Sequence, residues 1–182
     1  DFGRLSKFHD HDLPFVNRPQ ALDQFVDGES QATGVEASYL APTSRYLNLT
    51  AGAYNKIGAE NDRADNSEDR SLNKFTYLGR ASTFFELDEA NSIDLGGSFA
   101  YTPEVAEEND GSRGLAGVDL TYRYTPLDQA SYRGIVWGTE WLHNSEDRAP
   151  GESSDGVVDP AVEGGDPEFN RQNADGVYSY LE

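Results

Sequence analysis

The stretch Asn73–Leu87, NKFTYLGRASTFFEL, decides the fold class. Phe75, Tyr77 and Phe85 share one parity in this stretch, whereas Arg80 and Glu86 share the other. Side chains of a β-strand point alternately to opposite faces, so this spacing predicts a strand with an apolar face and a polar face. The density of Gly, Thr, Tyr and Phe and the lack of a 3.6-residue apolar stripe disfavour a helix.

The same alternation recurs on both sides of this stretch. The further segments are Gly34–Ala41, Tyr46–Tyr54, Ser92–Tyr101, Gly114–Tyr124, Tyr132–His143 and Gly176–Leu181. Together the segments predict an all-β, antiparallel fold of about seven strands. Several are about 9–11 residues long or longer, which is the length that a tilted strand needs to cross a bilayer.

The connections between these segments alternate between short and long. Residues 42–45, 88–91 and 125–131 form the short ones, and residues 56–72, 102–113 and 145–175 form the long ones. Short turns on one side and long loops on the other are typical of outer-membrane barrels. We therefore expect residues 34–182 to form barrel-wall hairpins with long loops, preceded by a loop or constriction-like segment over residues 1–33.

The charge is concentrated in these loops. The chain of 182 residues has 33 acidic and 14 basic residues and a formal net charge of -19, most of it in residues 1–33 and the three long loops. Nucleic acid is not expected as a partner, because phosphates are bound by clustered Lys and Arg. No Cys is present, which excludes disulfides and thiolate metal sites. No apolar run is long enough for a transmembrane helix, whereas alternating barrel strands escape hydropathy analysis.

Aromatic residues are expected at both ends of the strands, as in the girdles at the two membrane interfaces. The girdle at the short turns is predicted from Tyr39, Tyr46, Phe85, Tyr122, Tyr124 and Tyr132. The girdle at the long loops is predicted from Tyr54, Phe75, Tyr77, Phe99, Tyr101, Trp137 and Trp141.

With these features the chain resembles Gram-negative outer-membrane porin-like barrels, most nearly the phosphate-selective porin O and P type. The resemblance lies in FGRLSKFHDHDLPFVNRPQALDQF, in GVEASYL and YLNLTAGAYN, and in the two hairpins that follow. It implies a larger meander barrel in the bacterial outer membrane, of which this chain is a part. It also implies passive diffusion of small hydrophilic solutes or ions, with outer-membrane lipid and lipopolysaccharide as surroundings. The resemblance leaves open whether the chain forms a homo-oligomer.

The polar face of the predicted strands supplies the candidate site. The residues expected to line the pore are Glu36, Arg80, Glu86, Asp94, Asp119, Arg123 and Glu140. Five acids against two arginines depart from the basic pores of the phosphate-selective type and predict a mild cation preference instead. Two alternatives stay open: a non-conducting barrel that displays acidic loops for adhesion, and a soluble β-domain that binds divalent cations.

The sequence offers little for metal binding or catalysis. His9 and His11, flanked by Asp10 and Asp12, are candidate ligands for Zn²⁺, although no distant third ligand is evident. No cofactor is expected beyond a weakly held divalent cation at residues 62–69 or 107–111, which offer oxygen ligands without the EF-hand pattern. His143, Ser145 and Asp147 lie close in sequence, but proximity alone does not make a triad, and we expect no enzyme.

Overall fold

The computed structural model describes residues 2–5, 13–15, 17–26, 32–55, 72–104, 111–126, 134–148 and 170–182. Its main element is one seven-stranded antiparallel sheet, in the strand order β1 to β7. The strands are β1 (Gly34–Leu40), β2 (Leu47–Tyr54), β3 (Thr76–Glu86), β4 (Asn91–Thr102), β5 (Arg113–Tyr124), β6 (Ile135–Arg148) and β7 (Asn170–Leu181). The predicted all-β fold with seven antiparallel strands is thus confirmed.

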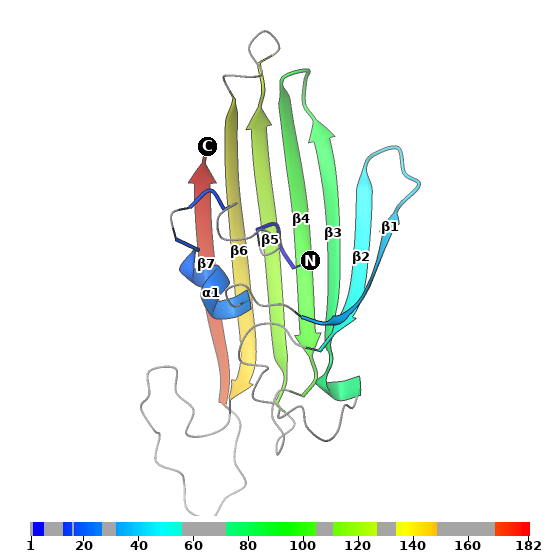
Figure 1. The fold of residues 1–182 in the computed structure, drawn as a ribbon, viewed down its shortest axis with the longest axis vertical. Coiled ribbons are helices and arrows are strands. Elements are labelled where there is room, and N and C mark those ends of the chain that lie inside the picture. The colour runs from blue at the N-terminus through cyan, green and yellow to red at the C-terminus, as the bar shows by residue number, and fades with distance from the viewer. Residues whose placement is uncertain are drawn as a thin grey trace, which may run out of the picture.

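Every strand pairs with its neighbours in sequence, so the sheet is a meander (Figure 1). The strand ends that the three short connections join lie at one end of the sheet, which we call the short-turn end, and the strand ends that the three long connections join lie at the other, the long-loop end. Among the described residues the sheet does not close, because β1 and β7 each pair on one side only.

The two faces of the sheet differ in composition, as the alternation predicts. The outer face, which includes Tyr77 of β3, carries large apolar side chains exposed to the surroundings. Its exposed members are Val35, Tyr39, Leu49, Tyr77, Phe99, Tyr101, Val118, Tyr124, Ile135, Trp137, Trp141, Val177 and Leu181. The opposite face, which includes Arg80, is called the inner face and carries most of the charged strand residues.

The described residues between positions 2 and 26, here called the N-terminal segment, lie over the inner face. The segment contains one short helix, α1 (Gln20–Val26), which contacts β6 and β7 (Figure 1). Leu22, Phe25 and Val26 are buried, at the i, i+3 and i+4 spacing that places side chains on one side of a helix. The loop or constriction-like segment predicted for residues 1–33 did not include this helix.

The hydrophobic core forms between this segment and the sheet. Phe2, Leu5 and Leu22 join the inner-face residues Leu115 and Leu142, both of which are fully buried. Phe15 packs edge-on against Tyr178 and Tyr180 of β7, with ring centroids 5.8 and 5.7 Å apart. The core is therefore on the inner face, and the apolar outer face has no covering layer among the described residues.

Several boundaries differ from the expected ones. β6 continues to Arg148 rather than ending at His143, and β7 begins at Asn170 rather than at Gly176. Antiparallel pairing from His143↔Asp175 to Arg148↔Asn170 extends this hairpin into residues with a loop-like composition. The helices in the described part of the chain are too short and polar to span a membrane.

The aromatic girdle was partly misassigned. Trp137 pairs with Tyr122, whose row continues through Ile93 to Phe85, so it lies at the short-turn end and not at the long-loop end. Trp141 pairs with Val118, near the middle of the strands. The error arose because β6 runs away from the short turn that precedes it.

Two further aromatics lie at the long-loop end as predicted, Tyr54 as the last residue of β2 and Phe75 directly before β3. Tyr54 differs from a girdle residue in its face, because it lies on the inner face, where its hydroxyl donates a hydrogen bond to Glu36. Tyr132 lies outside the described residues.

Candidate functional site on the inner face

The strand alternation places all seven residues predicted to line a pore on the inner face. Glu36 lies on the edge strand β1, and Glu86 lies at the short-turn end of β3; both are exposed. The other five, Arg80, Asp94, Asp119, Arg123 and Glu140, gather on β3 to β6. Asp119 and Glu140 are only 3% and 2% exposed, and Gly3 of the N-terminal segment lies directly against Glu140.

An ion pair between β3 and β5 forms the centre of this group. The two terminal nitrogens of Arg80 donate hydrogen bonds to the two carboxylate oxygens of Asp119, at 2.7 and 3.0 Å. The pair passes over Gly96 of β4, where an added Cβ would lie 2.4 Å from both partners. A side chain at this position would therefore displace the ion pair, and glycine leaves room for the close approach of the two side chains.

Asp94 of β4 forms the second ion-pair cluster. One of its carboxylate oxygens accepts hydrogen bonds from Arg123 of β5 and, at 3.2 Å, from Arg4 of the N-terminal segment. Ser98 ties the same segment to the first pair, since its hydroxyl accepts hydrogen bonds from Arg80 at 2.7 Å and from the Gly3 amide at 3.0 Å. The N-terminal segment is therefore attached to both clusters.

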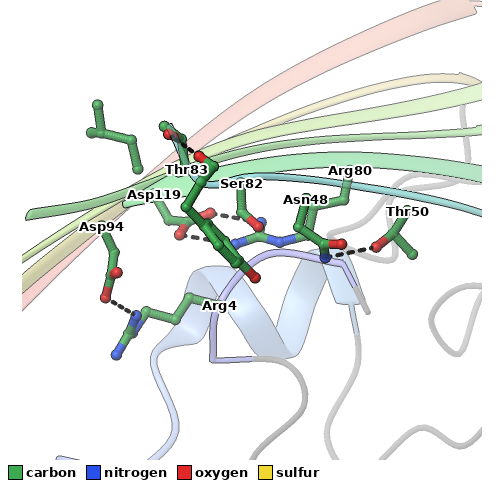
Figure 2. Close-up of a pocket in the computed structure, with 10 residues that line it drawn as sticks. Arg4, Asn48, Thr50, Arg80, Ser82, Thr83, Asp94 and Asp119 are labelled. Atoms are coloured by element: carbon green, nitrogen blue, oxygen red, sulfur yellow. Dashed lines mark hydrogen bonds and ion pairs between the residues drawn. The ribbon is translucent and has the colours of Figure 1, made fainter. Parts of the chain in front are cut away.

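A cavity of about 240 Å³ opens between these two clusters (Figure 2). Its polar lining comes from Arg4, Tyr46, Asn48, Thr50, Arg80, Ser82, Thr83, Asp94 and Asp119. In Figure 2 the side chains of Arg4, Asp94, Asn48 and Arg80 surround one space beside the sheet. The cavity is smaller than the roughly 300–1,000 Å³ of typical drug-sized ligand sites, which limits an occupant to a small solute.

Glu140 lies beneath the N-terminal segment, next to Asp119 on the neighbouring strand. One of its carboxylate oxygens accepts a hydrogen bond from the Tyr178 hydroxyl. Neither its Oε1 nor the hydroxyl of the fully buried Thr121 has a hydrogen-bond partner among the described residues. A Cβ added to Gly3, whose φ is 64°, would lie 2.0 Å from Oε1, so the segment approaches Glu140 through a residue without a side chain.

Several polar residues of this face were not predicted from the sequence. Arg113 and Glu146 have the same parity as Asp119 and Glu140 on β5 and β6, so a longer reading of the alternation would have included them. Arg113 is 2% exposed and donates hydrogen bonds to Asn144 at 2.9 Å and to the Phe25 carbonyl in α1 at 2.7 Å. Arg4 had no sequence signal, because its role depends on long-range docking.

The candidate metal ligands are not described. His9, His11 and the acidic stretches 62–69 and 107–110 lie outside the described residues, so nothing places them. Within the part of the chain that the structure covers, no group of three or more potential metal ligands comes together.

The third candidate, His143 with Ser145 and Asp147, has its side chains on the outer face of β6. His143 Nδ1 lies 2.9 Å from Asp175 of β7 and not against Asp147. The Asp147 carboxylate instead accepts hydrogen bonds from Arg171, at 2.8 and 3.0 Å, and from the Ser112 hydroxyl. A catalytic triad with Ser145 would need a hydrogen bond between Asp147 and His143, and these two side chains do not make one.

Comparison with known proteins adds no neighbour: no family model, no curated protein and no solved structure matches the chain. The sheet, its two faces and the cavity are therefore the features from which a function can be inferred.

Proposed function

We propose that the seven strands form part of the wall of an outer-membrane β-barrel. Small hydrophilic solutes or ions diffuse passively through the lumen of this barrel. The observation that carries this proposal is the contrast between the two faces of one sheet. The outer face exposes large apolar and aromatic side chains, while the inner face carries arginines, carboxylates and hydroxyls. A transmembrane barrel wall alternates apolar residues toward lipid with polar residues toward the lumen.

The strand lengths fit a bilayer. β3 to β7 contain 11 to 14 residues, against about 9–11 for a tilted membrane strand. Tyr101 pairs with Gly114, and Tyr124 lies ten residues further along β5, at the opposite end of the apolar face. Ten residues span about 34 Å along a strand, or roughly 26 Å along the membrane normal at a tilt of about 40°. Outer-membrane barrels have an apolar band of about 25 Å.

The open edges of the sheet also favour a barrel. Among the described residues, β1 and β7 each have a strand partner on one side only, and unpaired strand edges are not tolerated within the hydrocarbon region of a membrane. In the proposal, further strands or further copies of the chain complete the pairing. The N-terminal segment then lies inside the lumen and narrows it, which agrees with the constriction expected from the sequence.

Conductance across a planar lipid bilayer tests this proposal. The purified protein is refolded in detergent and added to one side of the membrane under a KCl gradient. We expect stepwise currents, with a reversal potential directed toward cations because acids outnumber bases among the predicted lining residues.

The other outcomes separate the rival functions. A protein that inserts into vesicles but never conducts would refute the channel and leave the adhesive barrel. A protein that remains in the aqueous phase during detergent partitioning would refute the membrane placement and leave the soluble β-domain. An anion-directed reversal potential would keep the channel and refute the assignment of the lining residues.

A further inference from the structure

We infer that the inner-face cavity is a binding site for a small, uncharged, polyhydroxylated solute of the size of a monosaccharide. The inference rests on the proposed function, because it names the class of solute that the channel would bind on its way through. It is carried by the pairing of the charges that line the cavity and by the polar groups that remain free.

The charged groups of the cavity already satisfy one another. Two guanidiniums, those of Arg4 and Arg80, face two carboxylates, those of Asp94 and Asp119. Arg80 is bound through both terminal nitrogens to Asp119, and Arg4 is bound to Asp94. A charged solute would have to compete with one of these pairs and would leave its former partner without a counter-charge, which is costly in a partly buried site. The pairing therefore disfavours anions and cations alike.

The remaining free groups of the cavity include both donors and acceptors. On the donor side, the hydroxyls of Ser82 and Tyr46 make no hydrogen bond to the described residues. On the acceptor side, the second carboxylate oxygen of Asp94 and the amide oxygen of Asn48 are available.

Hydroxyl groups match such a lining. A hydroxyl both donates and accepts, so adjacent hydroxyls of one sugar bridge a guanidinium and a carboxylate without disturbing the ion pair. Hydrogen bonds to charged partners are about twice as strong as neutral ones, which compensates for the small contact area. The cavity of about 240 Å³ restricts the solute to a single small ring or chain.

Weak binding is expected, since a channel must also release its solute. For a hexose with a ligand efficiency near that of drug-sized molecules, the dissociation constant is on the order of a few millimolar. Two measurements on the full chain in detergent micelles or vesicles separate binding from conduction. Equilibrium dialysis with radiolabelled glucose gives binding, and the glucose dependence of the bilayer current gives occlusion. Gluconate and glucosamine serve as the anionic and cationic counterparts of nearly equal size.

We expect glucose to bind at millimolar concentration and both charged analogues at least 10-fold more weakly. Ser82→Ala removes one free hydroxyl of the cavity and should weaken glucose binding about 3- to 10-fold, which corresponds to the loss of one hydrogen bond. Ser92→Ala is the matched control. Ser92, on β4, lies on the inner face like Ser82 but outside the cavity, so its substitution should leave glucose binding unchanged. Arg4→Gln removes one charge and keeps donors, so it should raise the affinity for glucosamine relative to glucose.

Binding of gluconate or glucosamine that equals or exceeds that of glucose would overturn the inference, as would glucose binding that Ser82→Ala and Ser92→Ala affect equally. Conductance without any glucose binding up to about 100 mM, well above the affinity expected for a hexose, would also overturn it and leave the proposed channel intact. Glucose binding in dialysis without conductance would support the site and refute the channel.

Discussion

A charged residue on the outer face of β5 would show whether that face contacts lipid. Val118 is 54% exposed and lies near the middle of the strand, between Gly97 and Trp141 on the neighbouring strands. In the proposed barrel this position is near the bilayer midplane, where an arginine on the lipid face destabilises by about 2–4 kcal/mol. Val118→Arg should therefore lower the equilibrium constant for folding roughly 30- to 700-fold.

Tyr124→Arg is the control for depth. Tyr124 lies on the same strand and face, six residues from Val118, which is about 20 Å along the strand and roughly 15 Å along the membrane normal. That distance reaches the interface, where an arginine costs only about 0–1 kcal/mol. Val118→Ala accounts for the loss of the valine itself.

Unfolding by urea in lipid vesicles measures these differences, with the fluorescence of Trp137 and Trp141 as the signal. Both tryptophans are on the outer face, about 40% exposed, so their emission should shift when they leave lipid. In a soluble β-domain an exposed valine tolerates arginine within about 0.5 kcal/mol. Equal stabilities of Val118→Arg and Tyr124→Arg, within that margin, would refute the placement of this face in a membrane.

Three further perturbations probe the inner face and a turn. Leu142→Ala, at a fully buried position under the N-terminal segment, should cost about 2–5 kcal/mol of unfolding free energy in denaturant titrations. Gly3→Ala places a Cβ 2.0 Å from Glu140 Oε1 at a φ of 64°, so hydrogen exchange of the Phe2–Leu5 amides should speed up; unchanged protection would contradict the docking. The Asn91 side chain and the Ala90 amide lower the pKa of Asp88, so its stabilising effect is present above the unfolded pKa near 4 and is lost as pH falls through the folded pKa. The stability difference between the wild type and Asp88→Ala should therefore shrink below about pH 4, and a difference that is constant with pH would contradict this role.

The alternation of residues predicted the strands and their faces well. In a strand the parity of a residue fixes its face, and a one-residue slip would exchange the two faces completely. The assignment of Arg80, Asp94, Asp119, Arg123 and Glu140 to one face therefore followed from the sequence alone. Pairing between neighbours in the chain also followed, because short turns join antiparallel strands.

The strand ends and the covering of the inner face did not follow. Residues at the end of β6 and the start of β7 are acidic and amide-rich, as loops are, but cross-strand pairing, including Arg171 with Asp147, keeps them extended. The N-terminal segment is separated from its contacts by long stretches of chain; Arg4 and Asp94, for example, are 90 positions apart. No local pattern encodes such a contact, so the burial of Asp119 and Glu140 was not predicted.

The packing of the N-terminal segment on the inner face changes the selectivity that is expected from the charges of that face. Counted from the strands alone, acids exceed arginines, which predicts attraction of cations. The N-terminal segment adds Arg4 to the cavity and covers Glu140, so the space that a solute would enter is lined by equal numbers of guanidiniums and carboxylates. Ion preference and solute preference then have different origins. In the proposed channel, the acids outside the cavity, such as Glu36 and Glu86, would act on passing ions at long range, whereas the paired groups within it would act through hydrogen bonds at contact. A channel of this kind can be mildly cation-selective in salt and still bind an uncharged solute best.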